Sequence, residues 1–192
     1  MKKLVFASSN EHKRSEIIAI LPKNIELVNL TDLNIFEEIP ETGDTLEANA
    51  TIKAKYVYDR TGLDCFAEDT GLEVFCLNNE PGVISARYAG PARNASDNMD
   101  LLLNKMGQES NRKARFRTVI ALIWQDEIYY FEGMVSGTIA LNKSGSAGFG
   151  YDPVFIPDGF NQSFAELGDE IKNSISHRSV AVNKMMEFLK NQ

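Results

Sequence analysis

The chain has 192 residues, of which 43% are hydrophobic and 24% are charged, a composition typical of one globular domain. Its 27 acidic residues outnumber the 20 basic ones, which gives a formal net charge of −7. An acidic surface disfavours binding to a DNA or RNA backbone, whereas a small anionic substrate could still bind where lysines or a metal ion offset the charge. With only two histidines and two cysteines, a zinc site built from these residues is poorly supported.

The N-terminal sequence MKKLVFASSN is basic, but its apolar run is too short for a signal peptide. No stretch of the sequence approaches the length needed to span a membrane, so we expect a cytoplasmic protein. Cys65 and Cys76 lie in strand-like runs without C-x-x-C spacing. We therefore expect buried free thiols rather than a disulfide.

The first predicted strand and helix enclose a small polar turn. Lys3–Ala7 is apolar and predicts the strand, while Lys13–Leu21 predicts a helix that Pro22 ends. In one interpretation the turn Ser8–Asn10 is a phosphate cradle, in which backbone N–H groups and the Lys13 ammonium face an anion. In the other interpretation the serine and asparagine side chains merely cap the helix.

A second strand is predicted at Ile25–Leu30, followed by an acidic loop that reaches Gly43. From Asp44 onward, apolar residues recur at helical spacing. They are Leu46, Ala50, Ala54 and Val57. Lys53 lies immediately beside this apolar face. A solvent-exposed lysine is the ordinary interpretation, and a lysine reaching over the packed edge into a cleft is the alternative.

Two adjacent acids, Glu68 and Asp69, follow an apolar run at Asp64–Ala67. Thr70 and Gly71 come next, and we expect the strand to end here and the glycine to break it. The acids would then point into the crevice beyond the carboxyl end of the strand, where α/β sheets place ligands. Hard oxygen ligands at such a place suit Mg²⁺, which usually shares its coordination shell with substrate phosphates.

The rest of the chain predicts two helices, at Asn94–Met106 and Ser176–Lys190, and two strands, at Phe116–Trp124 and Glu127–Val135. A turn at residues 125–126 joins the two strands directly. Because no helix separates them, we expect a mixed sheet rather than a purely parallel one. The sequence has no internal repeat and no linker, which favours one domain.

The segment Lys143–Pro153 is the most glycine-dense part of the chain, and glycines let a backbone pass close to a ligand. Phe149 and Tyr151 supply flat apolar faces on which a nucleobase could stack, and Asp152 supplies an acceptor. A flexible loop tip with an aromatic side chain packed into the core is the alternative interpretation.

Six motifs follow one another in a fixed order along the whole chain. They are SNEHKRSE at 9–16, ETG at 41–43 through Glu47 and Asn49 to KA at 53–54, AEDTGL at 67–72, PGVISARY at 81–88, GFGYDP at 148–153 and SHR at 176–178. Together they resemble the inosine/xanthosine triphosphate pyrophosphatase family, which removes aberrant purine nucleotides. Two positions depart from that pattern: Glu68 stands where aspartate is often found, and Thr70 where serine is common. Both keep the functional group.

The resemblance implies an α/β fold in an elongated single domain, with a mixed twisted sheet flanked by helices and an active-site cleft between two lobes. It implies a homodimer and Mg²⁺-dependent hydrolysis of ITP, dITP and XTP to the monophosphate and pyrophosphate, which keeps these nucleotides out of DNA and RNA. Two alternatives are a pyrophosphatase for modified pyrimidine nucleotides and a non-catalytic nucleotide sensor. Asp69, Glu41 and Lys53 argue against the sensor, because binding alone needs no acid–base groups.

Carried over position by position, the resemblance implies that Asp69 accepts a proton and, with Glu41, holds Mg²⁺, with Glu68 as a further candidate ligand. Lys53 would neutralise phosphate charge. The residues implied to hold the triphosphate are Ser8, Ser9, Asn10, Glu11, His12 and Lys13. Those implied to hold the rest of the nucleotide are Thr70, Phe149, Gly150, Tyr151, Asp152, Lys172, His177 and Arg178. Arg178 has only donors and would suit the 6-keto oxygen of hypoxanthine or xanthine.

Overall fold

The computed structural model of the protein describes residues 2–192, which divide into two compact units. Unit 1 takes its described residues from the segments Met1–Asp69, Thr118–Gly133 and Arg178–Gln192. Unit 2 consists of Thr70–Arg117 and Met134–His177. Neither unit is one continuous stretch of chain, which explains why the sequence contains no linker between them.

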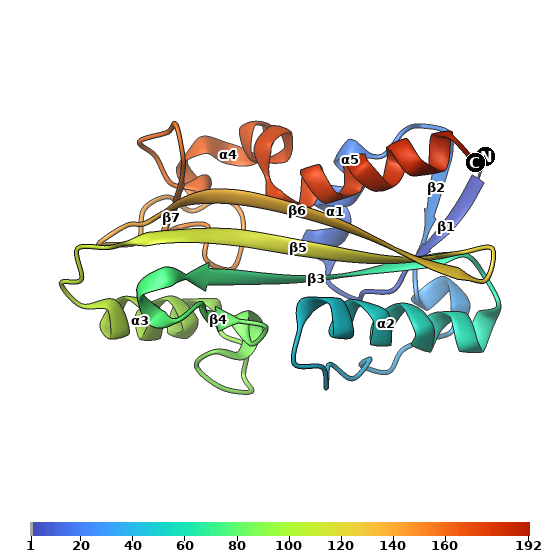
Figure 1. Ribbon diagram of the computed structural model, residues 1–192, viewed down its shortest axis with the longest axis horizontal. Coiled ribbons are helices and arrows are strands. Elements are labelled where there is room, and N and C mark those ends of the chain that lie inside the picture. The colour runs from blue at the N-terminus through green and yellow to red at the C-terminus, as the bar shows by residue number, and fades with distance from the viewer. Residues whose placement is uncertain (1) are drawn as a thin grey trace. The chain divides into compact units, whose positions relative to one another are not determined.

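The two units share three long strands, β3 (Cys65–Val74), β5 (Lys113–Trp124) and β6 (Glu127–Ile139) (Figure 1). The other elements of unit 1 are β1 (Lys2–Phe6), α1 (Glu11–Ile20), β2 (Ile25–Val28), η1 (Thr31–Leu33), α2 (Leu46–Thr61) and, from its second residue, α5 (His177–Lys190). Those of unit 2 are η2 (Phe75–Leu77), β4 (Glu80–Gly82), η3 (Ser85–Arg87), α3 (Ala95–Met106), β7 (Phe155–Pro157) and α4 (Phe164–Ile175).

The strands form a mixed sheet, as the direct connection of two predicted strands indicated. Its order is β2-β1-β3-β5-β6-β7, with β4 paired to β3. Strand β1 runs parallel to β2 and to β3, whereas β4 is antiparallel to β3 and β7 is antiparallel to β6. The predicted mixed sheet flanked by helices is therefore confirmed, and the elongated shape and the cleft stay predictions.

In unit 1, helices cover both faces of the sheet (Figure 1). Along β1, Leu4 and Phe6 face α1 and α5, whereas Val5 faces α2, as the two-residue period of a strand requires. Helix α2 packs its apolar stripe, including Ala50 and Ala54, onto that second face. The stripe predicted from helical spacing is thus the buried face of α2, and the polar residues of the same face are buried with it.

The core of unit 2 gathers side chains from α3, α4 and the strands that it shares. Aromatic rings form its centre: the Phe155 ring lies 4.7 Å from Phe116 and 5.4 Å from Phe164 between centroids. Helix α4 begins with a capping box, in which Ser163 and Glu166 satisfy each other's backbone N–H groups. The inward apolar residues predicted for α3, among them Met99 and Leu102, are buried in this core.

One strand differs from its prediction in a way that matters for the site. Strand β3 does not break at Gly71 but continues to Val74. The glycine is needed for another reason: a Cβ at Gly71 would lie 2.6 Å from the carbonyl oxygen of Gly82 in β4. Gly71 therefore allows the antiparallel partner to approach closely, and the prediction of a break is wrong.

Smaller differences concern the ends of elements and the thiols. Strand β5 begins three residues earlier than predicted and β6 extends to Ile139, while the two-residue turn between them is confirmed, with positive φ angles of 50° and 68°. Both cysteines are free. Cys65 is buried, and burial raises its pKa to about 12, whereas Cys76 is only partly buried. None of the described helices is long and apolar enough to cross a membrane.

Candidate active site

The two adjacent acids lie within β3, and the strand sends them to opposite faces. Glu68 is 1% exposed and Asp69 is 6% exposed. Because successive residues of a strand point to opposite sides, Glu68 meets side chains from α1 and α5, whereas Asp69 meets side chains from α2. Both acids do lie past the carboxyl end of β1, which pairs with β3 only as far as Phe66. The prediction that they share one crevice is wrong, because β3 continues through them.

On the α2 side, one buried ammonium joins two carboxylates. Lys53 Nζ lies 2.9 Å from Asp69 Oδ1 and 2.7 Å from Glu41 Oε1. Its side chain is only 8% exposed, so the interpretation of Lys53 as a solvated surface residue is wrong. A fourth side chain completes the group, because Asn49 Nδ2 donates to the other oxygen of Asp69 at 3.2 Å.

The sequence of α2 explains how these groups meet. Thr45 caps the helix by accepting a hydrogen bond from the Ala48 N–H, so the first turn begins at a fixed residue. Asn49 and Lys53 are four residues apart, which places them one above the other on the buried face. Both therefore reach the same carboxylate of β3 from consecutive turns.

The electrostatics of this group keep Lys53 charged. Burial alone would lower the pKa of Lys53, but the carboxylates of Asp69 and Glu41 more than offset that effect and raise it above its ordinary value. Lys53 is therefore protonated at neutral pH, with its charge fixed in place by packing.

On the opposite face of β3, Glu68 binds two cations. Arg178 donates to both of its oxygens, from Nε at 2.7 Å and from Nη2 at 3.0 Å, and Lys13 Nζ lies 2.9 Å from Oε1. The remaining terminal nitrogen of Arg178 donates to Glu16 of α1. Burial would raise the pKa of Glu68, yet Arg178 and Lys13 together hold it well below its usual range. Glu68 is thus ionised at neutral pH.

The predicted triphosphate-binding turn lies at the start of α1. Asn10 is its N-cap and accepts a hydrogen bond from the Lys13 N–H at 3.1 Å, while Ser8 Oγ accepts from the Asn10 N–H at 3.2 Å. Ser9, Glu11 and His12 are exposed at the same end of the helix. The capping interpretation is thus confirmed for Asn10. Phosphate binding by this turn stays a prediction. In this structure the Lys13 side chain extends from the first turn of α1 to Glu68.

In unit 2, the glycine-rich segment closes around a further buried ion pair. Lys172 Nζ lies 2.5 Å from Asp152 Oδ2, and the same oxygen accepts from the Phe149 N–H at 2.8 Å. Gly148 has a φ of +74°, and a Cβ on it would lie 2.1 Å from that oxygen, so glycine is required for this turn. The Phe149 ring lies 4.6 Å from the Lys172 ammonium. Asp152 therefore holds both Phe149 and Lys172 in place.

The other residues predicted to bind the nucleotide differ in exposure. Tyr151 is 5% exposed and lies in the core of unit 2, where its hydroxyl donates to the Ser85 carbonyl oxygen at 2.8 Å. For Tyr151, the alternative of an aromatic side chain packed into the core is therefore confirmed. His177 is also buried and stacks on Phe116 with centroids 4.6 Å apart. Thr70 and Gly150 are partly buried. The nucleotide contacts of these residues stay predictions.

Two residues of these clusters belong to the motifs of the sequence, but neither was predicted to take part in the site. Asn49 is fully buried on the same helix face as Lys53, and Glu16 lies one turn after Lys13 and binds Arg178. A polar residue one turn from a predicted site lysine, on an otherwise apolar face, would have been a usable indication for Asn49. For Glu16 the indication is weaker, because α1 has a mostly exposed surface.

The donors of this site suit one kind of metal ion better than others. Glu41 and Asp69 offer carboxylate oxygens, and no described side chains form a cluster of three or more acidic, histidine or cysteine ligands. A metal ion at this pair would need further ligands from a substrate or from water. That is the usual way in which Mg²⁺ is held, with one or two carboxylates and the phosphates of the substrate.

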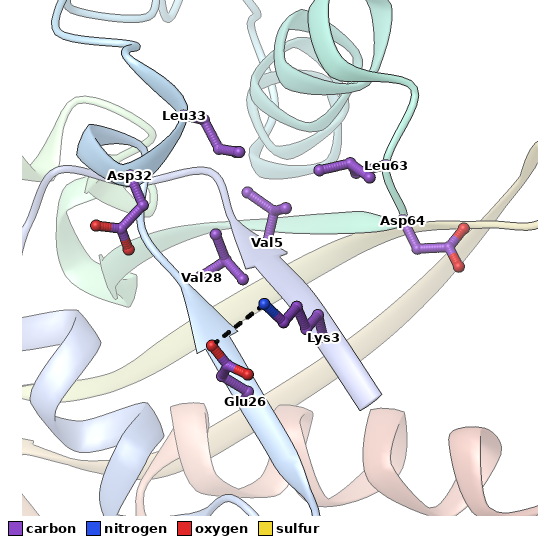
Figure 2. Close-up of a pocket in the computed structure, with 8 residues that line it drawn as sticks. All are labelled: Lys3, Val5, Glu26, Val28, Asp32, Leu33, Leu63 and Asp64. Carbon is purple, nitrogen blue, oxygen red and sulfur yellow. Dashed lines mark ion pairs between the residues drawn. The ribbon is translucent and has the colours of Figure 1, made fainter. Parts of the chain in front are cut away.

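A pocket of about 470 Å³ elsewhere in unit 1 has a different character (Figure 2). It lies beside β1 and β2, where Lys3 and Glu26 form an ion pair at 3.7 Å. Its lining residues are Lys3, Val5, Glu26, Val28, Asp32, Leu33, Leu63 and Asp64. With three carboxylates and one lysine around an apolar floor, this pocket is unsuited to a triphosphate.

Comparison with known proteins places the chain in a family. A family model described as the Ham1 family matches residues 4–188. The chain is 54% identical, over 98% of both sequences, to the dITP/XTP pyrophosphatase of Porphyromonas gingivalis. It is 52% identical, over 97% of both sequences, to the protein of that name from Flavobacterium johnsoniae.

Two solved structures are also similar to it. The Ham1 protein of Staphylococcus aureus is 40% identical, with a TM-score of 0.90 and 99% of both chains covered. A HAM1 protein of Coxiella burnetii is 35% identical, with a TM-score of 0.92 and both chains fully covered. These similarities confirm the resemblance that the six ordered motifs indicated, together with the α/β fold. The chain belongs to the Ham1 family.

Proposed function

We propose that this protein hydrolyses ITP, dITP and XTP to the nucleoside monophosphate and pyrophosphate. The observation that carries the proposal is the buried Lys53 ammonium held between Glu41 and Asp69. Hydrolysis of a phosphate anhydride needs cations for the phosphates and a carboxylate for the proton of water, and this group supplies both. The names of the relatives, dITP/XTP pyrophosphatases, support this class of substrate.

In the proposed reaction, a water molecule attacks the α-phosphorus in line with the leaving pyrophosphate. The bond between the water oxygen and the α-phosphorus forms, the bond from that phosphorus to the bridging oxygen breaks, and Asp69 takes the proton of the water. Lys53 donates N–H groups to the phosphate oxygens as negative charge builds on the leaving side. Its raised pKa supports this role, because it keeps the ammonium charged.

Glu41 and Asp69 are the residues that we propose hold Mg²⁺. Glu68 is a weaker candidate because two cations, Arg178 and Lys13, already neutralise it, whereas Glu41 and Asp69 share the single cation of Lys53. When bound, Mg²⁺ would offset phosphate charge and orient the triphosphate. The homodimer remains a prediction from the resemblance, and the cytoplasmic location remains a prediction from the sequence.

The first prediction concerns the bond that is cleaved. With ITP as substrate, we expect inosine monophosphate and pyrophosphate as the first products, because attack at the α-phosphorus releases the two outer phosphates together. Phosphorus NMR of the reaction mixture distinguishes the possible products. Orthophosphate and the diphosphate as first products would contradict the proposal. A panel of modified pyrimidine nucleotides tests the alternative substrate class, and absence of turnover on every nucleotide would favour the sensor.

The second prediction concerns the metal ion. Dialysis against EDTA should abolish pyrophosphate release from ITP, and added Mg²⁺ should restore it, because Glu41 and Asp69 are hard oxygen donors. Circular dichroism before and after dialysis checks that the fold is retained. Full turnover by the dialysed protein in the continued presence of EDTA would show that the two carboxylates serve another purpose.

The third prediction concerns the proposed base. Asp69→Asn keeps the shape of the side chain but loses its charge and basicity, and kcat should fall by roughly 10²–10⁴-fold. Asp64→Asn is a matched control, since Asp64 precedes the same strand and accepts a backbone hydrogen bond from Gln125 at 2.9 Å outside the cluster. The control should keep kcat close to that of the unaltered protein. Near-normal kcat in Asp69→Asn would rule out this base.

The fourth prediction concerns base selection. Hypoxanthine and xanthine present a 6-keto acceptor, whereas adenine presents a 6-amino donor that cannot pair with the donors of Arg178. A site built on buried hydrogen bonds can reject such a mismatch by roughly 10⁴-fold, so kcat/KM for ITP and XTP should far exceed that for ATP. Exclusion of GTP, which shares the keto group, must depend on the 2-amino group of guanine.

Arg178→Ala should lower kcat/KM for ITP much more than for ATP. Because Arg178 also binds Glu68 and Glu16, part of the loss will be common to both substrates, and the ratio of the two is the informative quantity. Lys13→Ala is the matched control, since Lys13 binds the same Glu68 and is expected at the triphosphate. It should lower both values equally. An unchanged ratio in Arg178→Ala would show that Arg178 does not select the base.

A further inference from the structure

Asn49 is a fully buried side chain whose two polar atoms are both bonded within unit 1. Its Oδ1 accepts from the Gly43 N–H at 2.7 Å, and its Nδ2 donates to Asp69 Oδ2 at 3.2 Å. A backbone N–H can only donate and a carboxylate can only accept, so the two partners together fix which way the amide is turned. Asn49 therefore has one orientation in which both of its bonds are made.

The bond to Asp69 restricts a side chain that would otherwise be loosely held. Rotation of a carboxylate about its last torsion is broad and weakly restricted. In this structure Lys53 binds Oδ1 at 2.9 Å while Asn49 binds Oδ2, so donors from consecutive turns of α2 hold both oxygens. The plane of the Asp69 carboxylate is thus defined by two donors on one helix.

The bond to Gly43 restrains the loop that carries Glu41. A Cβ at Gly43 would lie 2.6 Å from the Ala48 Cβ and 2.9 Å from Asn49 Oδ1, so only glycine allows this approach. Glu41 lies two residues earlier and reaches Lys53 Nζ at 2.7 Å. Through one amide, α2 therefore holds both the loop with Glu41 and the strand with Asp69.

We propose that Asn49 is a positioning residue that sets the separation and orientation of the Glu41 and Asp69 carboxylates for Mg²⁺. The inference rests on the proposed function, because it concerns the same two carboxylates. Asn49 acts through Gly43 and Asp69 and takes no proton. Residues that orient metal ligands in this way commonly change metal affinity or activity by roughly 10–100-fold when they are removed.

The chain offers a matched control in Asn98. This residue is 3% exposed on α3, its Oδ1 accepts from the Ala89 N–H at 2.7 Å, and its Nδ2 donates to the Ala86 carbonyl oxygen at 3.0 Å. Asn98 is thus nearly as buried as Asn49 and likewise accepts one hydrogen bond and donates one, but both of its partners are backbone groups. Asn49→Ala and Asn98→Ala should therefore lower the thermal midpoint by similar amounts.

The two variants should differ in their effect on the site. Calorimetric titration of the nucleotide-free protein with Mg²⁺ should show affinity reduced by roughly 10–100-fold in Asn49→Ala and unchanged in Asn98→Ala. With ITP at saturating Mg²⁺, kcat should fall in Asn49→Ala while KM changes by less than about threefold, because the interaction is made with catalytic groups rather than with substrate. Unchanged Mg²⁺ affinity and unchanged kcat in a folded Asn49→Ala protein would overturn the proposal.

Gly43→Ala tests the same link from the loop and carries the test if Asn49→Ala does not fold. The added methyl group should displace the loop from Asn49 and weaken Mg²⁺ binding by a similar factor. In the double variant the two losses should not add, because both remove one connection. Losses of Mg²⁺ affinity that add in the double variant would contradict the proposed link between Gly43 and Asn49. If the unaltered protein binds Mg²⁺ but releases no pyrophosphate from any nucleotide, the proposed function fails, while the calorimetry still decides the role of Asn49.

Discussion

The pleat of β3 is the constraint on which the rest of the site depends. Neighbouring residues of a strand point to opposite faces, so Glu68 and Asp69 cannot share a partner. Both are buried, and a buried ion costs several kcal/mol unless a counter-ion and hydrogen bonds compensate it. Each face of the strand must therefore bring its own cation. Helix α2 therefore supplies Lys53 to Asp69, whereas α1 and α5 supply Lys13 and Arg178 to Glu68.

Burial lowers the pKa of a lysine and raises the pKa of a carboxyl group, and an oppositely charged partner reverses both shifts. Burial disfavours the charged form of Lys53 and of Glu68 alike, yet the pKa of Lys53 lies above its ordinary value and that of Glu68 lies well below. At neutral pH the charges are therefore present and fixed by packing before any ligand arrives. Charges that need no rearrangement at the moment of reaction are the ones that stabilise a transition state most effectively.

Local sequence patterns were sufficient to predict the helices and the way in which neighbouring strands are connected. Helical spacing placed α2, α3 and α5, and two strands joined without a helix predicted the mixed sheet. Partners far apart in sequence could not be predicted from pattern: 110 residues separate Arg178 from Glu68. The family resemblance singled out both residues, but it gave no indication that they bind each other. Asn49 stands in one of the motifs, but its role could not be predicted for a different reason, since a polar residue within an apolar helix face has no role until its partner strand is known.

The misjudged Gly71 shows why glycine is hard to interpret from sequence alone. A strand break, a turn and a close approach all call for a missing side chain, and only the partner tells them apart. In this chain Gly71 makes room for the Gly82 carbonyl, and Gly43 makes room for the Asn49 amide. Groups that must converge on buried charges need space where a Cβ would otherwise lie. Gly43, Gly71 and Gly148 are therefore explained by the polar atoms that they allow to approach, whereas Gly150 meets nothing within 4 Å and is explained by its φ of +64°.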